Sequence, residues 1–133
     1  MFSYVRISLY VVAVLALVGS SACAKETPAH PEAWYRDEVA RKLGGKTEVQ
    51  VPNGRVDILT EAYAIEVEKA TNWKEAIGQC LWYSLQTNKR AGIVLIVTNE
   101  KRDRGHIIRL GSVIQANELP IRVWIWPDDF ENE

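Results

Sequence analysis

The chain has 133 residues, of which 47% are hydrophobic and 25% are charged, and it contains only two cysteines. This length and composition predict one small domain whose hydrophobic core is large enough to fold without disulfide staples. The formal net charge of −1 by itself gives no indication of nucleic-acid binding, so a surface that binds phosphate would have to be a local basic patch.

Residues 1–24 have the features of an export signal. Arg6 supplies the positive charge, residues 7–18 are apolar, and Ala22 to Ala24 fit a cleavage site. The apolar run is too short for a membrane span, which needs about 20 apolar residues. We therefore predict an exported protein, periplasmic or secreted. Two alternatives stay open: lipid anchoring at Cys23, and a start codon placed too early, which would leave a cytoplasmic protein.

The rest of the chain alternates between helical and extended patterns. Residues 25–31 contain two prolines and predict a flexible leader, and Gly44-Gly45 ends the first helix. A hairpin turn is predicted at residues 52–54. In chain order, the predicted elements are a helix at 32–43, strands at 46–51, 54–60 and 64–69, a helix from 71 or 72 to 86, a strand at 93–97, a helix at 101–118 and a strand at 121–126.

This order of elements predicts an α/β fold, in which helices flank a mixed sheet. Residues 93–97 are continuously apolar, as expected of a strand that is covered on both faces. A final helix and strand follow the αβββαβ part of the chain. We predict that the domain spans residues 32–127 and that residues 128–133 form an acidic tail.

Acidic side chains gather on two neighbouring strands of this predicted sheet. Asp57 lies among apolar residues, whereas Glu66 and Glu68 point to one face of their strand. Carboxylates that are held close together repel one another and resist burial, so a cluster of them needs a compensating cation. Hard oxygen ligands suit Mg²⁺ or Mn²⁺. The same spacing also fits a hairpin that turns its acids to solvent.

Asp57, followed after a short gap by Glu66-Val67-Glu68, resembles the metal-binding signature of the PD-(D/E)XK nuclease superfamily. Downstream, Gln79 and Tyr83 resemble the QxxxY helix motif of its RecB-like branch. The resemblance implies a restriction-endonuclease-like fold and a metal-dependent nuclease that hydrolyses phosphodiester bonds. It also implies Mg²⁺ or Mn²⁺ as cofactor and nucleic acid as partner, with DNA favoured over RNA.

The resemblance further implies which residues bind the metal. Asp57 and Glu66 would be ligands together with the backbone carbonyl of Val67, and the cation would polarise the phosphodiester. Glu38 lies in the first predicted helix, where many members of the superfamily carry an extra acid. Pairing of Glu38 with Lys42, four residues later, is the alternative interpretation.

The remaining catalytic positions depart in part from the family pattern. Glu68 stands where the family usually has a lysine, so Lys69 or Lys74 would have to replace that lysine. Gln79 and Tyr83 are one helical turn apart and would approach the same edge of the acidic cluster. Alternatively, one is a surface amide and the other a half-buried aromatic. The core stripe of this helix is predicted at Ile77, Cys80, Leu81 and Ser84.

Basic residues concentrate in two stretches, which either grip a nucleic-acid backbone or form solvated surfaces. Trp124 and Trp126 share one strand face, where they would stack on bases or cover the core. The basic stretches contain Lys89 and Arg90, and then Lys101, Arg102, Arg104, His106 and Arg109.

Two functions follow from these patterns. The first is an exported metal-dependent nuclease. The alternative is a nuclease-like fold that has lost catalysis and serves as an exported binding or interaction module, which the glutamate at position 68 favours.

Overall fold

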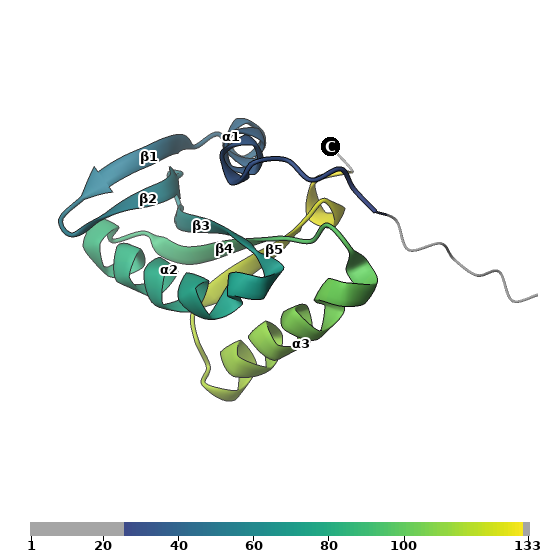
Figure 1. Ribbon diagram of the computed structural model, residues 1–133. Coiled ribbons are helices and arrows are strands. Elements are labelled where there is room, and N and C mark those ends of the chain that lie inside the picture. Colours follow the sequence, from purple (N-terminus) through teal and green to yellow (C-terminus); the bar gives the residue numbers. More distant parts are fainter. Residues whose placement is uncertain (1–25, 132–133) are drawn as a thin grey trace, which may run out of the picture.

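The computed structural model describes residues 26–131, so the predictions for residues 1–24, including Cys23, fall outside the described part. The predicted α/β class is confirmed, with helices on both sides of a mixed five-stranded sheet (Figure 1). The elements are α1 (Glu32–Leu43), β1 (Lys46–Val51), β2 (Gly54–Leu59), β3 (Tyr63–Lys69), η1 (Ala70–Asn72), α2 (Trp73–Thr87), β4 (Arg90–Ile96), α3 (Glu100–Ala116), β5 (Ile121–Trp126) and η2 (Asp128–Phe130).

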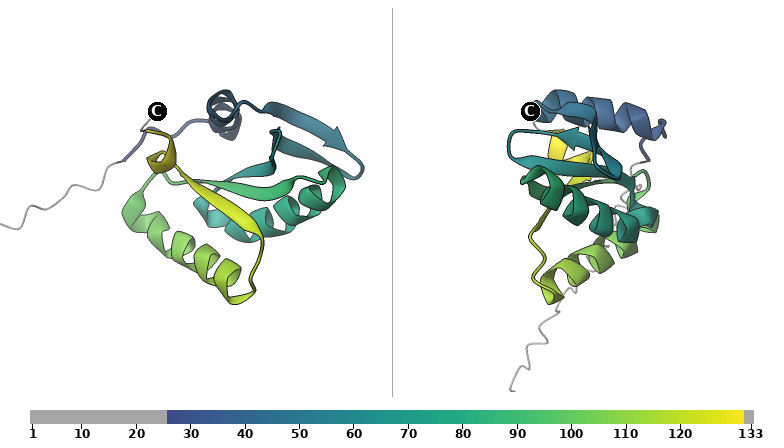
Figure 2. Two further views of the ribbon diagram at one scale, coloured as in Figure 1. Left: turned by 180° about the vertical axis from the view of Figure 1, so that it is seen from behind. Right: turned by 90° about the vertical axis from the view of Figure 1, so that its left-hand side faces the viewer.

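The strands lie side by side in the order of the sequence, from β1 to β5. The β1–β2 and β2–β3 pairs are antiparallel, because short turns connect them, whereas β3, β4 and β5 are parallel and are joined by α2 and α3. Helix α1 covers one face of the sheet, and α2 and α3 cover the other (Figures 1 and 2).

Strand β4 is buried on both faces, as its continuous apolar run predicts. Val94 and Ile96 pack with α1 in one hydrophobic cluster, whereas Ile93 and Leu95 pack with α2 and α3 in another. These four side chains are at most 2% exposed. No helix within residues 26–131 is long and apolar enough to cross a membrane.

Helix α2 buries a different stripe from the one predicted. Cys80 is buried as expected, but Tyr83 is buried too and Gln79 is exposed. Tyr83 packs against Val56 and Ala64, because the β1–β2 hairpin curls over the end of α2. The stripe that is fully covered is Trp73, Ala76, Cys80 and Tyr83.

The contact between Tyr83 and Gly54 predicts the effect of a single methyl group. A Cβ atom at Gly54 would lie 2.5 Å from the phenol ring, so Gly54→Ala should lower the free energy of unfolding by about 1–3 kcal/mol. The matched control is Gly78→Ala on α2, where a Cβ atom would meet nothing within 4 Å. Urea unfolding should show Gly78→Ala unchanged or more stable. Equal stability of both variants would contradict the close packing.

Both ends of the described chain are attached to the domain. The predicted flexible leader lies against the β4–α3 loop, where Thr27 N donates to the carbonyl of Thr98 at 3.3 Å. Asn99 Nδ2 donates to Glu26 at 2.8 Å. At the other end, the segment predicted as an acidic tail forms η2, and its Phe130 is 4% exposed within the core. The acidic residues of this segment predicted a tail, but the ring of Phe130 buries apolar surface in the core.

Candidate functional site

The acidic residues meet where β2 separates from β3. The two strands pair only through Ile58 and Leu59 of β2, so the backbone of β3 beyond this point has no strand partner on that side. The carboxylate of Asp57 replaces that partner by accepting the N–H of Val67 at 2.9 Å. Glu66 lies beside Asp57 and is 3% exposed. The structure therefore brings together the two predicted main ligands.

Burial decides the charge of this pair. Desolvation, and then the charge of Asp57, raise the pKa of Glu66 to about 9. Burial also raises the pKa of Asp57, which the N–H of Val67 partly offsets. Glu66 is therefore neutral at pH 7 and shares its proton with Asp57 through a side-chain hydrogen bond. Its other oxygen, Oε1, is buried and has no hydrogen-bond partner.

The other acidic side chains do not complete a cluster around Asp57 and Glu66. Glu68 is half-buried and accepts a hydrogen bond from Asn72 at 3.1 Å. Glu38 points elsewhere on α1 and pairs with Arg41 at 2.8 Å, not with Lys42. Glu32 is the acid of α1 that interacts electrostatically with Asp57, and burial raises its pKa. Residues six apart lie on different sides of a helix, so Glu32 and Glu38 cannot both approach Asp57.

The predicted catalytic partners are also dispersed. Gln79 is exposed on α2, and the Tyr83 hydroxyl accepts the backbone N–H of Arg55 at 3.3 Å. Lys69 is exposed at the end of β3, and Lys74 lies over the ring of Trp73. Of the two residues that match the QxxxY motif, Tyr83 is therefore in the core and Gln79 is exposed to solvent.

A preformed cation site would need more than this pair offers. Among residues 26–131, no group of three or more His, Cys, Asp or Glu side chains is placed to hold a metal ion. Binding of Mg²⁺ or Mn²⁺ by Asp57 and Glu66 stays a prediction.

The basic residues form two separate surfaces. On α3, Lys101, Arg104 and Arg109 are exposed, whereas Arg102 pairs with Asp103 at 2.8 Å. The helix contains no Phe, Tyr or Trp. His106 is half-buried, and its Nδ1 has no hydrogen-bond partner.

The second basic surface lies at the start of β4 and β5 and combines cations with aromatic rings. The guanidinium of Arg90 lies 4.4 Å from the ring centroid of Tyr63. That of Arg122 lies 4.6 Å from the ring of Trp124. Both arginines are exposed, and no carboxylate within residues 26–131 pairs with either. Beside them, Lys89 Nζ donates to the carbonyl of Glu61.

Three hollows extend from this surface along the α1 side of the sheet. The first, of about 350 Å³, lies between Tyr63 and Trp124, and the second, of about 260 Å³, lies between Trp124 and Phe130. The third, of about 370 Å³, is lined by Phe130, Trp126 and Trp34. Because adjacent hollows share lining residues, we describe them together as the aromatic groove.

Three relatives provide a comparison with known proteins. They are KilA-N domain-containing proteins of Acanthamoeba polyphaga mimivirus, which are 34% identical over 76 residues, 41% over 68 residues and 38% over 54 residues. These stretches are 57%, 50% and 41% of this chain but only 21%, 18% and 22% of the relatives. The chain thus spans about a fifth of their length. No family model and no solved structure matches it.

The relatives correct the prediction that was based on the nuclease motifs. They are named for a KilA-N domain and not as nucleases, so the assignment to the PD-(D/E)XK superfamily and the metal-dependent nuclease function were wrong. The physical reason lies in the motifs themselves. Acids on adjacent strands and a Gln-to-Tyr spacing are short patterns, and here they produce a proton-sharing pair and a core tyrosine.

Proposed function

We propose that this protein is a non-catalytic nucleic-acid-binding module whose contact surface is the aromatic groove. The observation that carries the proposal is the pairing of exposed, carboxylate-free guanidiniums with aromatic rings at Arg90 and Arg122. Relatives named for a KilA-N domain support a binding role over a hydrolytic one.

The chemistry of the groove suits a phosphate backbone. An arginine that stacks on a ring keeps its in-plane N–H donors for a phosphate, and the ring limits the rotamers that binding would otherwise have to restrict. Arg90 and Arg122 both contact Tyr63, so two cations lie within reach of one stretch of backbone. The net charge of −1 would otherwise give no attraction, so this local concentration decides where a polyanion binds.

The α3 surface is the weaker candidate for the same role. Its exposed cations attract phosphate, but the helix offers no Phe, Tyr or Trp ring on which a base could stack. Both surfaces contribute non-specific attraction, whereas only the groove combines charge with aromatic contact. We propose DNA over RNA as the partner and export through residues 1–24 as the route to its compartment.

Removing Arg122, which lines the groove, together with Arg90, which lies beside it over Tyr63, should weaken binding in a salt-dependent way. Each phosphate contact to a single strand contributes about 0.7 to the slope of log K against log salt, so Arg90→Ala with Arg122→Ala should reduce that slope by roughly 1.4. Fluorescence anisotropy with a labelled oligonucleotide in EDTA measures this slope. EDTA keeps any metal-dependent process out of the measurement.

The matched control is Lys101→Ala with Arg104→Ala, which removes the same charge from α3. This control should retain most of the affinity of the unmodified protein. An equal loss in both double variants would mean that binding follows total charge and not the groove. Absence of binding at low salt would overturn the proposed function.

A further inference from the structure

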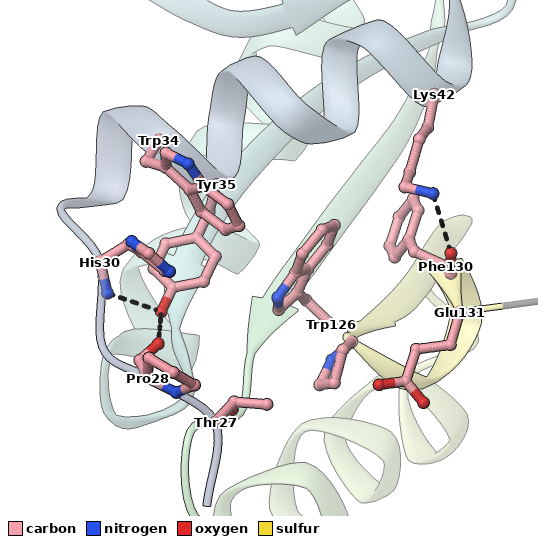
Figure 3. Close-up of a pocket in the computed structure, with 10 residues that line it drawn as sticks. Thr27, Pro28, His30, Trp34, Tyr35, Lys42, Trp126, Phe130 and Glu131 are labelled. Carbon is pink, nitrogen blue, oxygen red and sulfur yellow. Dashed lines mark hydrogen bonds between the residues drawn. The ribbon is translucent and has the colours of Figure 1, made fainter.

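The third hollow of the aromatic groove is a pocket built from segments far apart in the sequence. Figure 3 shows it between the leader and α1 on one side and Trp126 and η2 on the other. Its volume of about 370 Å³ lies within the range of roughly 300–1,000 Å³ that is typical of small-ligand sites. Thr27 and Glu131 also line it (Figure 3).

Aromatic rings from four segments form its walls. His30 of the leader stacks on Trp34 of α1 at 3.9 Å between ring centroids. Trp126 of β5 meets Trp34 edge to face, with 5.8 Å between ring centroids. The ring of Phe130 lies 5.3 Å from that of Trp126. Trp34 is 39% exposed, so a large ring surface stays in contact with solvent. A flat ring of a ligand would pack against these rings either stacked or edge to face, because aromatic pairs prefer these two geometries.

The geometry of the pocket is fixed by hydrogen bonds and not by the rings alone. The Tyr35 hydroxyl accepts the N–H of His30 at 3.0 Å and donates to the carbonyl of Pro28 at 3.2 Å (Figure 3). Tyr35 is 2% exposed, so the leader is tied to a buried anchor. The rings therefore keep their positions without a ligand, which lowers the entropy cost of binding.

The pocket has two ends of opposite charge, since Lys42 and Glu131 both line it and their charged groups lie apart (Figure 3). Lys42 Nζ donates to the carbonyl of Phe130 at 3.0 Å, which uses one of the three donors of the ammonium group. The remaining donors favour an anionic group at the Lys42 end of the pocket. A flat ring that carries a phosphate satisfies both the walls and Lys42.

We propose that this pocket receives an unpaired base of a single-stranded nucleic acid, with the adjoining phosphate at Lys42. The proposal rests on the proposed function, because Phe130 lines both this pocket and the second hollow of the aromatic groove. A base within a duplex is stacked and paired and cannot enter, so the pocket makes the module selective for single strands.

The test compares an oligodeoxynucleotide with a duplex of the same length and sequence, using Trp34→Ala. We expect the unmodified protein to prefer the single strand. Trp34→Ala should lower single-strand affinity by roughly 5- to 100-fold, as expected for the loss of one stacked base, and should leave duplex affinity unchanged. Quenching of tryptophan fluorescence by the oligonucleotide should shrink in this variant.

The matched control is Trp82→Ala, since Trp82 is 44% exposed on α2, on the opposite side of the sheet. It should bind both ligands like the unmodified protein. If Trp34→Ala behaves like Trp82→Ala, or weakens duplex binding equally, the base pocket is overturned while the proposed function stands. If the unmodified protein binds neither ligand, the proposed function itself fails. Equal melting temperatures of both variants exclude a folding defect.

Discussion

The free energy of unfolding should fall as the pH rises from about 4.5 to about 9, and Glu66→Gln should remove most of this fall. The folded pKa of Glu66 is raised above its ordinary value, so the folded protein holds a proton in this window that the unfolded chain has released. The stability that Glu66 contributes is therefore complete below about pH 4.5 and is lost as the pH rises through about 9. The slope for one proton is about 1.4 kcal/mol per pH unit.

Glutamine is the suitable replacement because it imitates the protonated acid. Its amide is neutral at every pH and retains a donor for Asp57, so Glu66→Gln should match the unmodified protein in acid and exceed its stability near pH 9. Urea unfolding at a series of pH values measures both curves. Glu75→Gln, at an exposed position in the first turn of α2, is the control. Parallel curves for the unmodified protein and Glu66→Gln would rule out a buried neutral acid.

Asp103→Ala should cost about 2–4 kcal/mol, because Asp103 holds the start of α3. Its carboxylate accepts the backbone N–H groups of Thr98 at 3.2 Å and Asn99 at 3.3 Å and pairs with Arg102, while the side chain is 2% exposed. Burial alone would raise the pKa of Asp103, but the hydrogen bonds from Arg102 and Asn99 outweigh it and the pKa is lowered. The alanine variant leaves two backbone donors without a partner.

A pH series separates this role from simple packing. Because the folded pKa is lowered, the contribution of Asp103 is present above its ordinary value of 3.8 and is lost as the pH falls through the folded value. The deficit of Asp103→Ala should therefore shrink in strong acid. Glu100→Ala, an exposed acid in the same first turn, should change stability by less than about 0.5 kcal/mol. A deficit that persists unchanged in acid would contradict the hydrogen-bond role.

Most of the fold follows from periodicity in the sequence. The predicted bounds 32–43, 46–51 and 121–126 coincide with α1, β1 and β5, because a glycine pair, a hairpin turn and a proline mark where these elements end. The parallel part of the sheet follows from a continuous apolar run at β4 between two helical segments. These signals are local, so they need no knowledge of how the chain folds back on itself.

The site was harder to predict because its residues come together only in the folded chain. Spacing on α2 places Gln79 and Tyr83 on one face, but the curl of the β1–β2 hairpin buries only Tyr83. The spacing of Glu66 fits either a metal ligand or a solvent-facing acid, and only the packing of α2 against β3 shows that it is buried. Arg90 belongs to a basic stretch, whereas its neighbour Arg122 lies alone in a strand and gives no signal in the sequence.

The two ends of the described chain meet at one place, since Thr27 and Pro28 line the same pocket as Phe130 and Glu131 (Figure 3). A polypeptide that enters and leaves its fold at neighbouring points can be spliced into a loop of a larger protein without disturbing the host or itself.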